Sequence, residues 1–375
     1  MMKGIDKSNV PVSGSRRAVG PFSLPERPLV TRLRHRTEPE ILATEGRARQ
    51  SLDGFPDRYV DIVDYIVRIT REIWIEGAIG LIYDCYDPNC VIYTAADVGR
   101  GVEGVVASTV ISMASFPDLD NHFLNVAWSE DPISGFYTSH LGFGTGLNIG
   151  RTAYGPATGR MTTIRFCADC ISLNGRIHTE WLARDNGALV RQLGLDLHDT
   201  ALLLAMTPPR EQPIREAPSR LVGQTPPRLV DPSSDALEQH FRALFHNVWN
   251  ARRFDVLAQH YGPDVQVHTA GGRVANGVAA LRALYLNLLA SMPDATMTVG
   301  NVCWSDETDG IIVAVRWELQ GTSRAGGWLG DMPGGVQVAV PGMTHCRLDE
   351  DGKIVEEWTV FDEVAVLANV YRQAQ

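Results

Sequence analysis

The sequence predicts an α+β protein made of two tandem cone-shaped domains, each with N-terminal helices packed in a curved, mostly antiparallel sheet. Three observations lead to this prediction. The chain has 375 residues, more than one hydrophobic core usually supports. A proline-rich stretch divides it, and the parts on either side repeat the same motifs in the same order. In each part, helical periodicity comes first and strand-like runs follow.

Composition divides the chain into four segments. Residues 1–56 hold ten Lys/Arg and six Asp/Glu among scattered prolines, a composition that does not fold alone, and we interpret them as a basic arm. Residues 57–205 and 233–375 are the two predicted domains, and the proline-rich residues 206–232 are the linker. We expect the arm to lie over the body or over a partner subunit, and its removal to leave both domains folded.

The first domain begins with a predicted amphipathic helix over 57–74, in which apolar residues recur every three or four positions. A second short helix over 78–86 ends at Asp87-Pro88. Strand-like runs follow, separated by turns rich in Gly, Asn, Asp and Pro, and a helix over 187–193 closes the domain. These runs cover residues 90–94, 123–128, 136–143, 161–172 and 176–184.

The second domain repeats the motifs of the first at a nearly constant offset. The tetrapeptide Ser-Phe-Pro-Asp at Ser115 returns as Ser-Met-Pro-Asp at Ser291, 176 residues later. The segment that leads to Trp181 returns before Trp358, with an offset of 177. The two halves are therefore copies of one unit. A bent sheet folded around a helix forms a cone with an apolar interior, which suits a small, largely apolar ligand.

Composition also disfavours several classes of function. The net charge is −10 and the arm carries +4, so the remainder carries −14, a poor match for nucleic acid. No apolar run approaches about 18 residues and no secretory leader is evident, so we expect a cytoplasmic protein that does not engage a membrane. The Cys167-x-x-Cys170 pair lacks further zinc ligands nearby. We expect neither a metal nor a cofactor, since no glycine-rich phosphate-binding motif follows a strand.

Several segments resemble a known family. They are Tyr261-Gly-Pro-Asp-Val-Gln-Val-His-Thr, Arg316-Trp-Glu-Leu-Gln-Gly and Asp351-Gly-Lys-Ile-Val-Glu-Glu-Trp-Thr, with a counterpart from Glu180 in the first domain. They resemble SnoaL-like polyketide cyclase domains of the nuclear-transport-factor-two-like superfamily, and the resemblance covers about 57–200 and 233–372. It implies the cone-shaped α+β fold. Because single domains of this superfamily commonly dimerise through the open sheet face, it also implies an internal pseudo-dimer, with possible further homo-oligomers through the arm.

The resemblance also implies a type of catalysis. The family's cyclases are cofactor-free and use a carboxylate directly after the motif tryptophan of the last strand, with a histidine on the preceding strand. Here Thr359 and Leu182 occupy the position after the tryptophans, so neither domain carries that carboxylate. His345 and His268 match histidine positions of the family.

Other ionisable residues fall on strands that we expect to line the cones. Alignment of the two domains predicts one set in the first cone, Tyr93, His140 and Asp169, and one in the second, His268, Arg316 and His345. A carboxylate near a histidine in an apolar pocket is suited to general acid–base catalysis, because burial moves each pKa toward neutrality.

We predict that the first cone is active, with Asp169 as the acid–base group and His140 and Tyr93 as its partners, whereas His345 and His268 are the catalytic candidates of the second cone. The predicted substrate-binding residues are Arg316, Glu180, Glu357, Trp74 and Trp249.

Three functions remain open at this point. The first is a cofactor-independent lyase, isomerase or cyclase acting on a small hydrophobic, aromatic or polycyclic substrate. The second is a non-catalytic small-molecule binder, and the third is a scaffold for protein contacts. Ionisable residues on the expected pocket strands favour the enzyme. Each residue also has a structural alternative: His345 and His268 could be hydrogen-bonded core histidines, and a one-residue error in strand phase would turn Asp169 outward.

Overall fold

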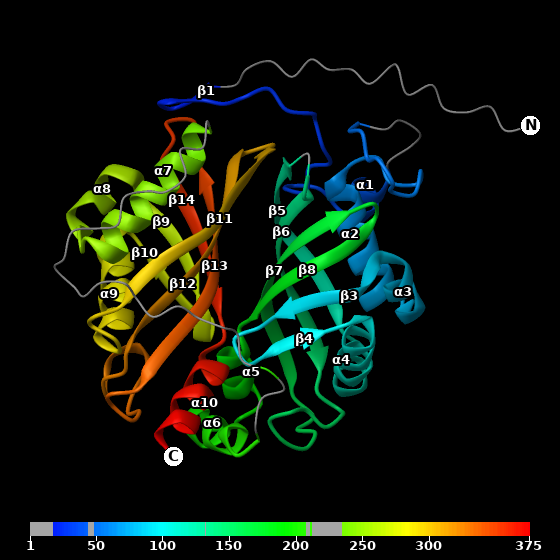
Figure 1. Ribbon diagram of the computed structural model, residues 1–375. Helices are drawn as coiled ribbons and strands as arrows, with labels where there is room; N and C mark the ends of the chain where they lie inside the picture. Colours follow the sequence, from blue (N-terminus) through cyan, green and yellow to red (C-terminus); the bar gives the residue numbers. More distant parts are fainter. Residues whose placement is uncertain (1–17, 44–48, 132, 208–210, 212–234) are drawn as a thin grey trace, which may run out of the picture.

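The computed structural model describes residues 18–43, 49–131, 133–207, 211 and 235–375. Two copies of one α+β unit stand side by side, each a curved sheet with helices on its outer side (Figure 1). The prediction of two tandem cone-like domains is confirmed. Most of the predicted linker lies outside the described residues. No helix of the described part is long and apolar enough to cross a membrane.

The first unit opens with the predicted amphipathic helix, α2 (Ile62–Trp74), which Asp61 caps by accepting a hydrogen bond from the amide of Asp64. A short turn and helix follow, η2 (Ile79–Leu81) and α3 (Ile82–Cys85). The remaining elements are β3 (Tyr86–Tyr93), β4 (Val98–Arg100), α4 (Val102–Ser115), β5 (Asp120–Asp131), β6 (Gly135–Leu147), β7 (Met161–Leu173), β8 (Arg176–Arg184), α5 (Asn186–Gln192) and α6 (Leu197–Ala205).

The second unit repeats this order. Its helical start is α7 (Ala236–Phe245), the π-helical turn η3 (His246–Asn250), η4 (Phe254–Val256) and α8 (Leu257–His260). Then come β9 (Tyr261–Thr269), η5 (Ala270–Gly272), β10 (Arg273–Asn276), α9 (Val278–Ala290), β11 (Thr296–Glu307), β12 (Gly310–Thr322), η6 (Gly327–Leu329), β13 (Gln337–Leu348), β14 (Ile354–Phe361) and α10 (Glu363–Ala374). Helices α4 and α9 were not predicted, because α4 is apolar on most sides and carries β-branched residues typical of strands.

The two sheets are joined into one of twelve strands, in the order β10-β9-β14-β13-β12-β11-β5-β6-β7-β8-β3-β4. Most neighbours are antiparallel, while β3 with β8 and β9 with β14 are parallel. The join between the units is narrow, since β11 and β5 pair only at Trp304 and Trp128. The sheet bends there, so the two halves face each other and the helices lie outside (Figure 1).

Alternation along each strand separates two environments. One set of side chains points into the helix-filled cone of its own unit, as Cys170 and Phe136 do in the first. The other set packs between the two sheets, where Leu141 and Cys167 of the first unit meet Met343 of the second. This is the face-to-face arrangement expected for an internal pseudo-dimer.

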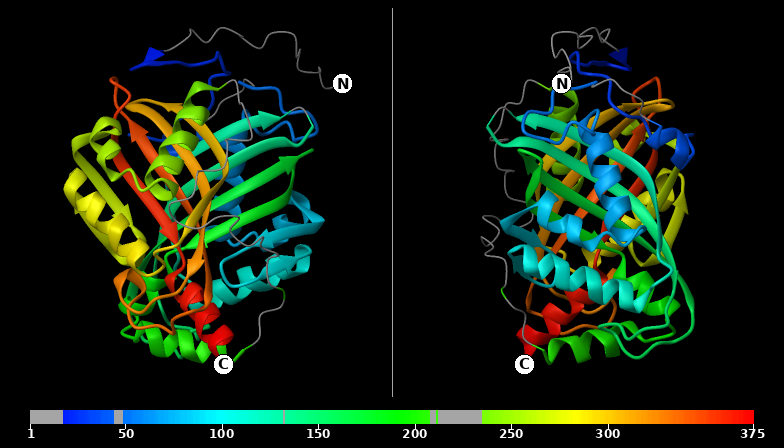
Figure 2. Two further views of the ribbon diagram at one scale, coloured as in Figure 1. Left: turned by 60° about the vertical axis from the view of Figure 1, so that its left-hand side comes forward. Right: turned by 90° about the vertical axis from the view of Figure 1, so that its right-hand side faces the viewer.

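The described part of the arm runs across both units (Figure 2). Its hairpin, β1 (Ala18–Val19) and β2 (Phe22–Ser23), places Val19 and Phe22 in the hydrophobic core of the second unit. Leu33 and Ile41, the latter on α1 (Glu38–Leu42), are buried in the core of the first. The arm is therefore part of both cores, contrary to the expectation that the domains fold without it.

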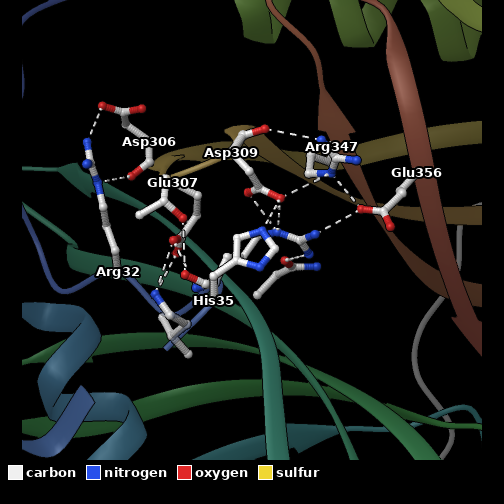
Figure 3. A network of polar contacts seen from close by, with 11 residues as sticks. Arg32, His35, Asp306, Glu307, Asp309, Arg347 and Glu356 are labelled. Atoms are coloured by element: carbon white, nitrogen blue, oxygen red, sulfur yellow. Dashed lines mark hydrogen bonds and ion pairs between the residues drawn. The ribbon is translucent and has the colours of Figure 1, made fainter. Parts of the chain in front are cut away.

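Charged groups fix the arm at the seam between the units. Arg27 lies between the rings of Trp128 and Trp304, 4.7 Å and 4.1 Å from their centroids, and its Nη1 donates to both backbone carbonyls at 3.1 Å and 2.7 Å. Figure 3 shows the next contacts, in which Arg32 pairs with Asp306 and the buried Glu307 accepts from the backbone of the arm. The arm thus clamps the first unit to the second.

Candidate active site

The structure divides the predicted site residues between two places. Inside the cones lie His140, Glu180 and Trp74 of the first unit and Glu357 and Trp249 of the second. Between the sheets lie Tyr93, Asp169, His268, Arg316 and His345. The expectation that these last five side chains line the cones is wrong.

Asp169 belongs to a polar cluster that joins the two sheets. It accepts a short hydrogen bond from the Tyr137 hydroxyl and lies 3.8 Å from Nε of Arg316, which also donates to that hydroxyl at 3.0 Å. The Arg316 guanidinium covers the ring of Trp181 at 3.8 Å. Burial raises the pKa of Asp169, against the opposing effect of Arg316. These contacts give Asp169 a role in holding the units together, and they leave its predicted catalytic role untested.

Of the three other residues in this region, His345 is buried, whereas Tyr93 and His268 are partly exposed. His345 is fully buried, with Nε2 2.9 Å from Oγ of Ser139 in the first unit. Burial, with a smaller contribution from His140, lowers the pKa of His345 to about 3. Tyr93 stacks on Trp181, and His268 stacks on Trp358 at the equivalent place of the other unit.

The misplacement of Arg316 has a definite cause. Strand β6 resumes at Gly135 after β5 ends at Asp131, whereas β12 resumes at Gly310 after Glu307, so the first turn is one residue longer. A constant offset of 176 therefore equates Arg316 with His140, although these two face opposite sides of their sheets. A shift of one residue exchanges the two faces of a strand.

The second cone contains a small aromatic hollow around Glu357. Its cavity volume is about 20 Å³, which leaves room for one water molecule. A larger ligand therefore requires side chains to move. The hollow is lined by Phe245, Trp249, Val267, Thr269, Leu284, Tyr285, Leu288, Trp317, Trp328, Thr344, Glu357, Thr359 and Phe361.

Glu357 is buried from solvent, with 1% of its surface exposed, and is held by hydroxyl groups alone among the described residues. Tyr261 donates to Oε2 at 2.7 Å, Tyr285 reaches Oε2 at 2.8 Å and Oε1 at 3.0 Å, and Thr359 donates to Oε1 at 3.2 Å. Burial raises the pKa of Glu357, and the three hydroxyls oppose this effect. Among the described residues no basic side chain contacts the group, and its raised pKa makes it suited to take up and return a proton of a ligand.

The first cone carries a related but simpler arrangement. Glu180 accepts a hydrogen bond from Tyr86 at 2.8 Å, and burial raises its pKa while Arg184 opposes this. His140 lies on the same side of the sheet, and burial lowers its pKa to about 4. The guanidinium of Arg184 also covers the ring of Trp74 at 5.7 Å. The carboxylate of the first cone thus has one phenol and a cationic neighbour, whereas that of the second has two phenols.

Three residues of the second site were not predicted from the sequence to be functional. Tyr261 was noticed only as a family motif, and Thr359 only as the position that lacks a carboxylate. Tyr285 lies on α9, which was not predicted at all. The available signal was the repetition of Tyr86 as Tyr261, because both tyrosines contact the glutamate of their own cone.

Nothing in the described residues forms a group of three or more His, Cys, Asp or Glu side chains that could hold a metal ion. Glu357 lies two positions before Thr359 on β14, on the same face of the strand. It therefore brings a carboxylate to the cone although the family's usual position is occupied by threonine. The carboxyl and hydroxyl groups gathered here are suited to proton transfer.

Comparison with known proteins identifies the family. The family model described as SnoaL-like polyketide cyclase matches residues 64–193 and again 239–370. No curated protein matches the sequence. Solved structures that match include a protein of Jannaschia sp. CCS1 assigned as a SnoaL-like polyketide cyclase, with 18% identity and a TM-score of 0.32 over 36% of this chain and 92% of that one. TsrD from Streptomyces laurentii gives 21% identity and a TM-score of 0.32 over 35% and 94%.

The two matched regions together span more than half of the chain and coincide with the two repeated units. The fold of each unit, with its helices packed in a curved sheet, agrees with this assignment. The chain belongs to the SnoaL-like polyketide cyclase family, of which it carries two tandem copies.

Proposed function

We propose that this protein is a cofactor-independent enzyme of the lyase, isomerase or cyclase type, which acts by general acid–base catalysis on a small hydrophobic, aromatic or polycyclic substrate. The observation that carries the proposal is Glu357, a buried carboxyl group with three hydroxyl partners in an aromatic hollow. The sequence alone favoured Asp169 for this role, but Asp169 is engaged between the sheets.

The arrangement supports the following chemistry. Glu357 as carboxylate removes a proton from a carbon next to a substrate carbonyl and then returns it at another position. In a cyclisation the enolate carbon instead attacks a second carbonyl of the same substrate, and the alkoxide formed there takes the proton back from Glu357. Once Glu357 has taken up the proton, the hydroxyl of Tyr285, which donates to Glu357 in the structure, turns to donate its hydrogen bond to the developing enolate oxygen. Thr359 and Tyr261 keep the carboxylate oriented. A positioned base of this kind contributes about 10²–10⁴ to the rate.

Carbon-acid exchange in a bicyclic aromatic ketone tests the proposal. The full-length protein is incubated with 2-tetralone in D₂O, and loss of the C1 proton signal is followed by NMR. Glu357→Gln should lower the enzyme-dependent rate by about 10²–10⁴, the usual contribution of a general base. Glu180→Gln, the matched change in the first cone, and Asp169→Asn should leave it within about threefold of wild type.

Three outcomes would contradict the proposal. A large loss in Glu180→Gln alone would place the reaction in the first cone. A large loss in Asp169→Asn, with the fold intact by circular dichroism, would support the assignment made from sequence. Saturable binding of 2-tetralone without exchange above the uncatalysed rate would indicate the non-catalytic binder instead.

A further inference from the structure

The loop between β12 and β13, residues 323–336, closes the second cone with an aromatic ring. Its neck is fastened by Ser323, whose amide donates to the carbonyl of Val336 at 2.8 Å and whose Oγ donates to the carbonyl of Pro333 at 2.6 Å. At its tip, η6 carries Trp328, which lines the hollow beside Glu357 and has only 6% of its surface exposed. Much of the space that a ligand would need is therefore filled by the protein itself.

The indole of Trp328 has partners on several sides. The guanidinium of Arg273 lies 4.1 Å from its ring centroid, and the ring of Phe361 lies 5.6 Å away at an angle of 47°. Its Nε1–H donates to Oε1 of Glu363, a side chain with no exposed surface. Arg273 and Arg191 form ion pairs with the same carboxylate. These contacts combine a cation–π contact, a tilted aromatic contact and one hydrogen-bond acceptor, as a site for an aromatic molecule would.

One serine holds this loop shut. Oγ of Ser291 donates to the carbonyl of Gly326 at 3.0 Å and accepts from the amide of Leu329 at 2.9 Å. Gly327 has φ +66°, and a Cβ there would lie 2.6 Å from the carbonyl oxygen of Asn287, so the loop sits directly on the end of α9. Ser291 is the serine of the duplicated Ser-x-Pro-Asp motif.

The first unit uses its copy of this motif in the same place but for a different loop. Oγ of Ser115 donates to the carbonyl of Arg151, in the loop between β6 and β7, at 2.7 Å. The latch is therefore duplicated, which provides a matched control for any change at Ser291.

We propose that Trp328 is a displaceable plug in the subsite for the aromatic part of the substrate, and that the ligand is a planar fused ring with an O–H or N–H donor directed at Glu363. Opening of the loop at Ser291 moves the indole out, and the ring takes its place against Arg273 and Phe361. A donor on the ligand is required because Glu363 otherwise loses a hydrogen bond while still buried, which is unfavourable. The inference rests on the proposed function, since it assigns the substrate class of the same cone.

Calorimetric titration of the full-length protein with 2-naphthol tests this subsite without turnover. Trp328→Ala should bind 2-naphthol about 10- to 100-fold more tightly than wild type, because displacement of a buried indole no longer opposes binding. Ser291→Ala should bind up to about tenfold more tightly, since two hydrogen bonds of the latch are lost. Ser115→Ala should match wild type. 2-Methoxynaphthalene, which cannot donate, should bind about tenfold more weakly than 2-naphthol.

A cavity made by mutation could bind naphthol without any role in the native protein. Displacement of Trp328 must therefore be measured in the wild-type protein. Protein labelled with 5-fluorotryptophan gives a ¹⁹F resonance for Trp328, identified by its loss in Trp328→Phe, and saturating 2-naphthol should shift it. An unmoved resonance would overturn the proposal, as would equal affinities of the Ser291→Ala and Ser115→Ala variants or of the two naphthalenes. If Trp328→Ala fails to fold, Trp328→Phe supplies the affinity comparison.

The outcomes separate this inference from the proposed function. Displacement of Trp328 by 2-naphthol without exchange of 2-tetralone would support the proposed subsite and contradict the proposed catalytic function. Exchange of 2-tetralone that depends on Glu357, with no change in the ¹⁹F shift of Trp328, would support the catalytic function and contradict the subsite.

Discussion

Acid should weaken this fold through His345, which lies buried and neutral between the two sheets. Burial lowers the pKa of His345 from the ordinary 6.5 to about 3. Between pH 6.5 and pH 3, His345 is therefore protonated in the unfolded chain and neutral in the folded protein. The stability present above pH 6.5 is therefore lost as pH falls toward 3. At pH 5 the linkage relation gives a loss of about 2 kcal/mol relative to pH 8 from this residue alone.

Urea unfolding of wild type and His345→Gln at pH 8, 7, 6 and 5 measures this loss. The glutamine does not titrate, so the difference in unfolding free energy between the two proteins should shift by about 2 kcal/mol in favour of the variant between pH 8 and pH 5. A difference between wild type and His345→Gln that stays constant with pH would refute the reasoning.

Three further changes test how the two units are joined. Arg27→Ala removes two hydrogen bonds to carbonyls and two cation–π contacts and should lower the free energy of unfolding by about 2–4 kcal/mol; a loss below about 0.5 kcal/mol in urea titration would contradict the clamp. Arg316→Met leaves Asp169 buried without its cation and should destabilise by about 3–5 kcal/mol, with Asp169→Asn restoring part of the loss in the double variant. Deletion of residues 1–43 removes buried side chains such as Val19 and Leu33 from the two cores and should lower the melting temperature by many degrees; an unchanged melting temperature would show that these core contacts are not stabilising.

The fold was predictable because its evidence is duplicated. Motifs that return after 175 to 177 residues, such as the serines at 115 and 291, define two copies of one unit independently of any single strand assignment. The helix over Ile62–Trp74 was equally clear from its periodicity. The role of the arm was not, since its few apolar residues, such as Phe22 and Leu33, bury into cores formed by distant parts of the chain.

The site was harder to predict because it depends on strand phase. Glu180, Glu357 and Trp249 were identified and do lie in the cones, but Asp169 turns toward the other sheet. For Arg316, a turn that differs by one residue between the repeats exchanged the faces, whereas the face of Asp169 was taken from the expected pocket direction of the family. Tyr285 comes from α9, which was not predicted although its Ala and Leu residues favour a helix, and only the three-dimensional arrangement brings its hydroxyl to Glu357.

The pH dependence of 2-tetralone exchange tests most directly whether Glu357 is the reacting base. Burial raises the pKa of this carboxyl, and only the deprotonated form can remove a proton. The account predicts that the enzyme-dependent rate rises with pH to a plateau, with an apparent pKa above the ordinary glutamate value of about 4.3, and that Glu357→Gln lacks this rise. A Glu357→Gln protein with the same rate and pH profile as wild type would contradict it.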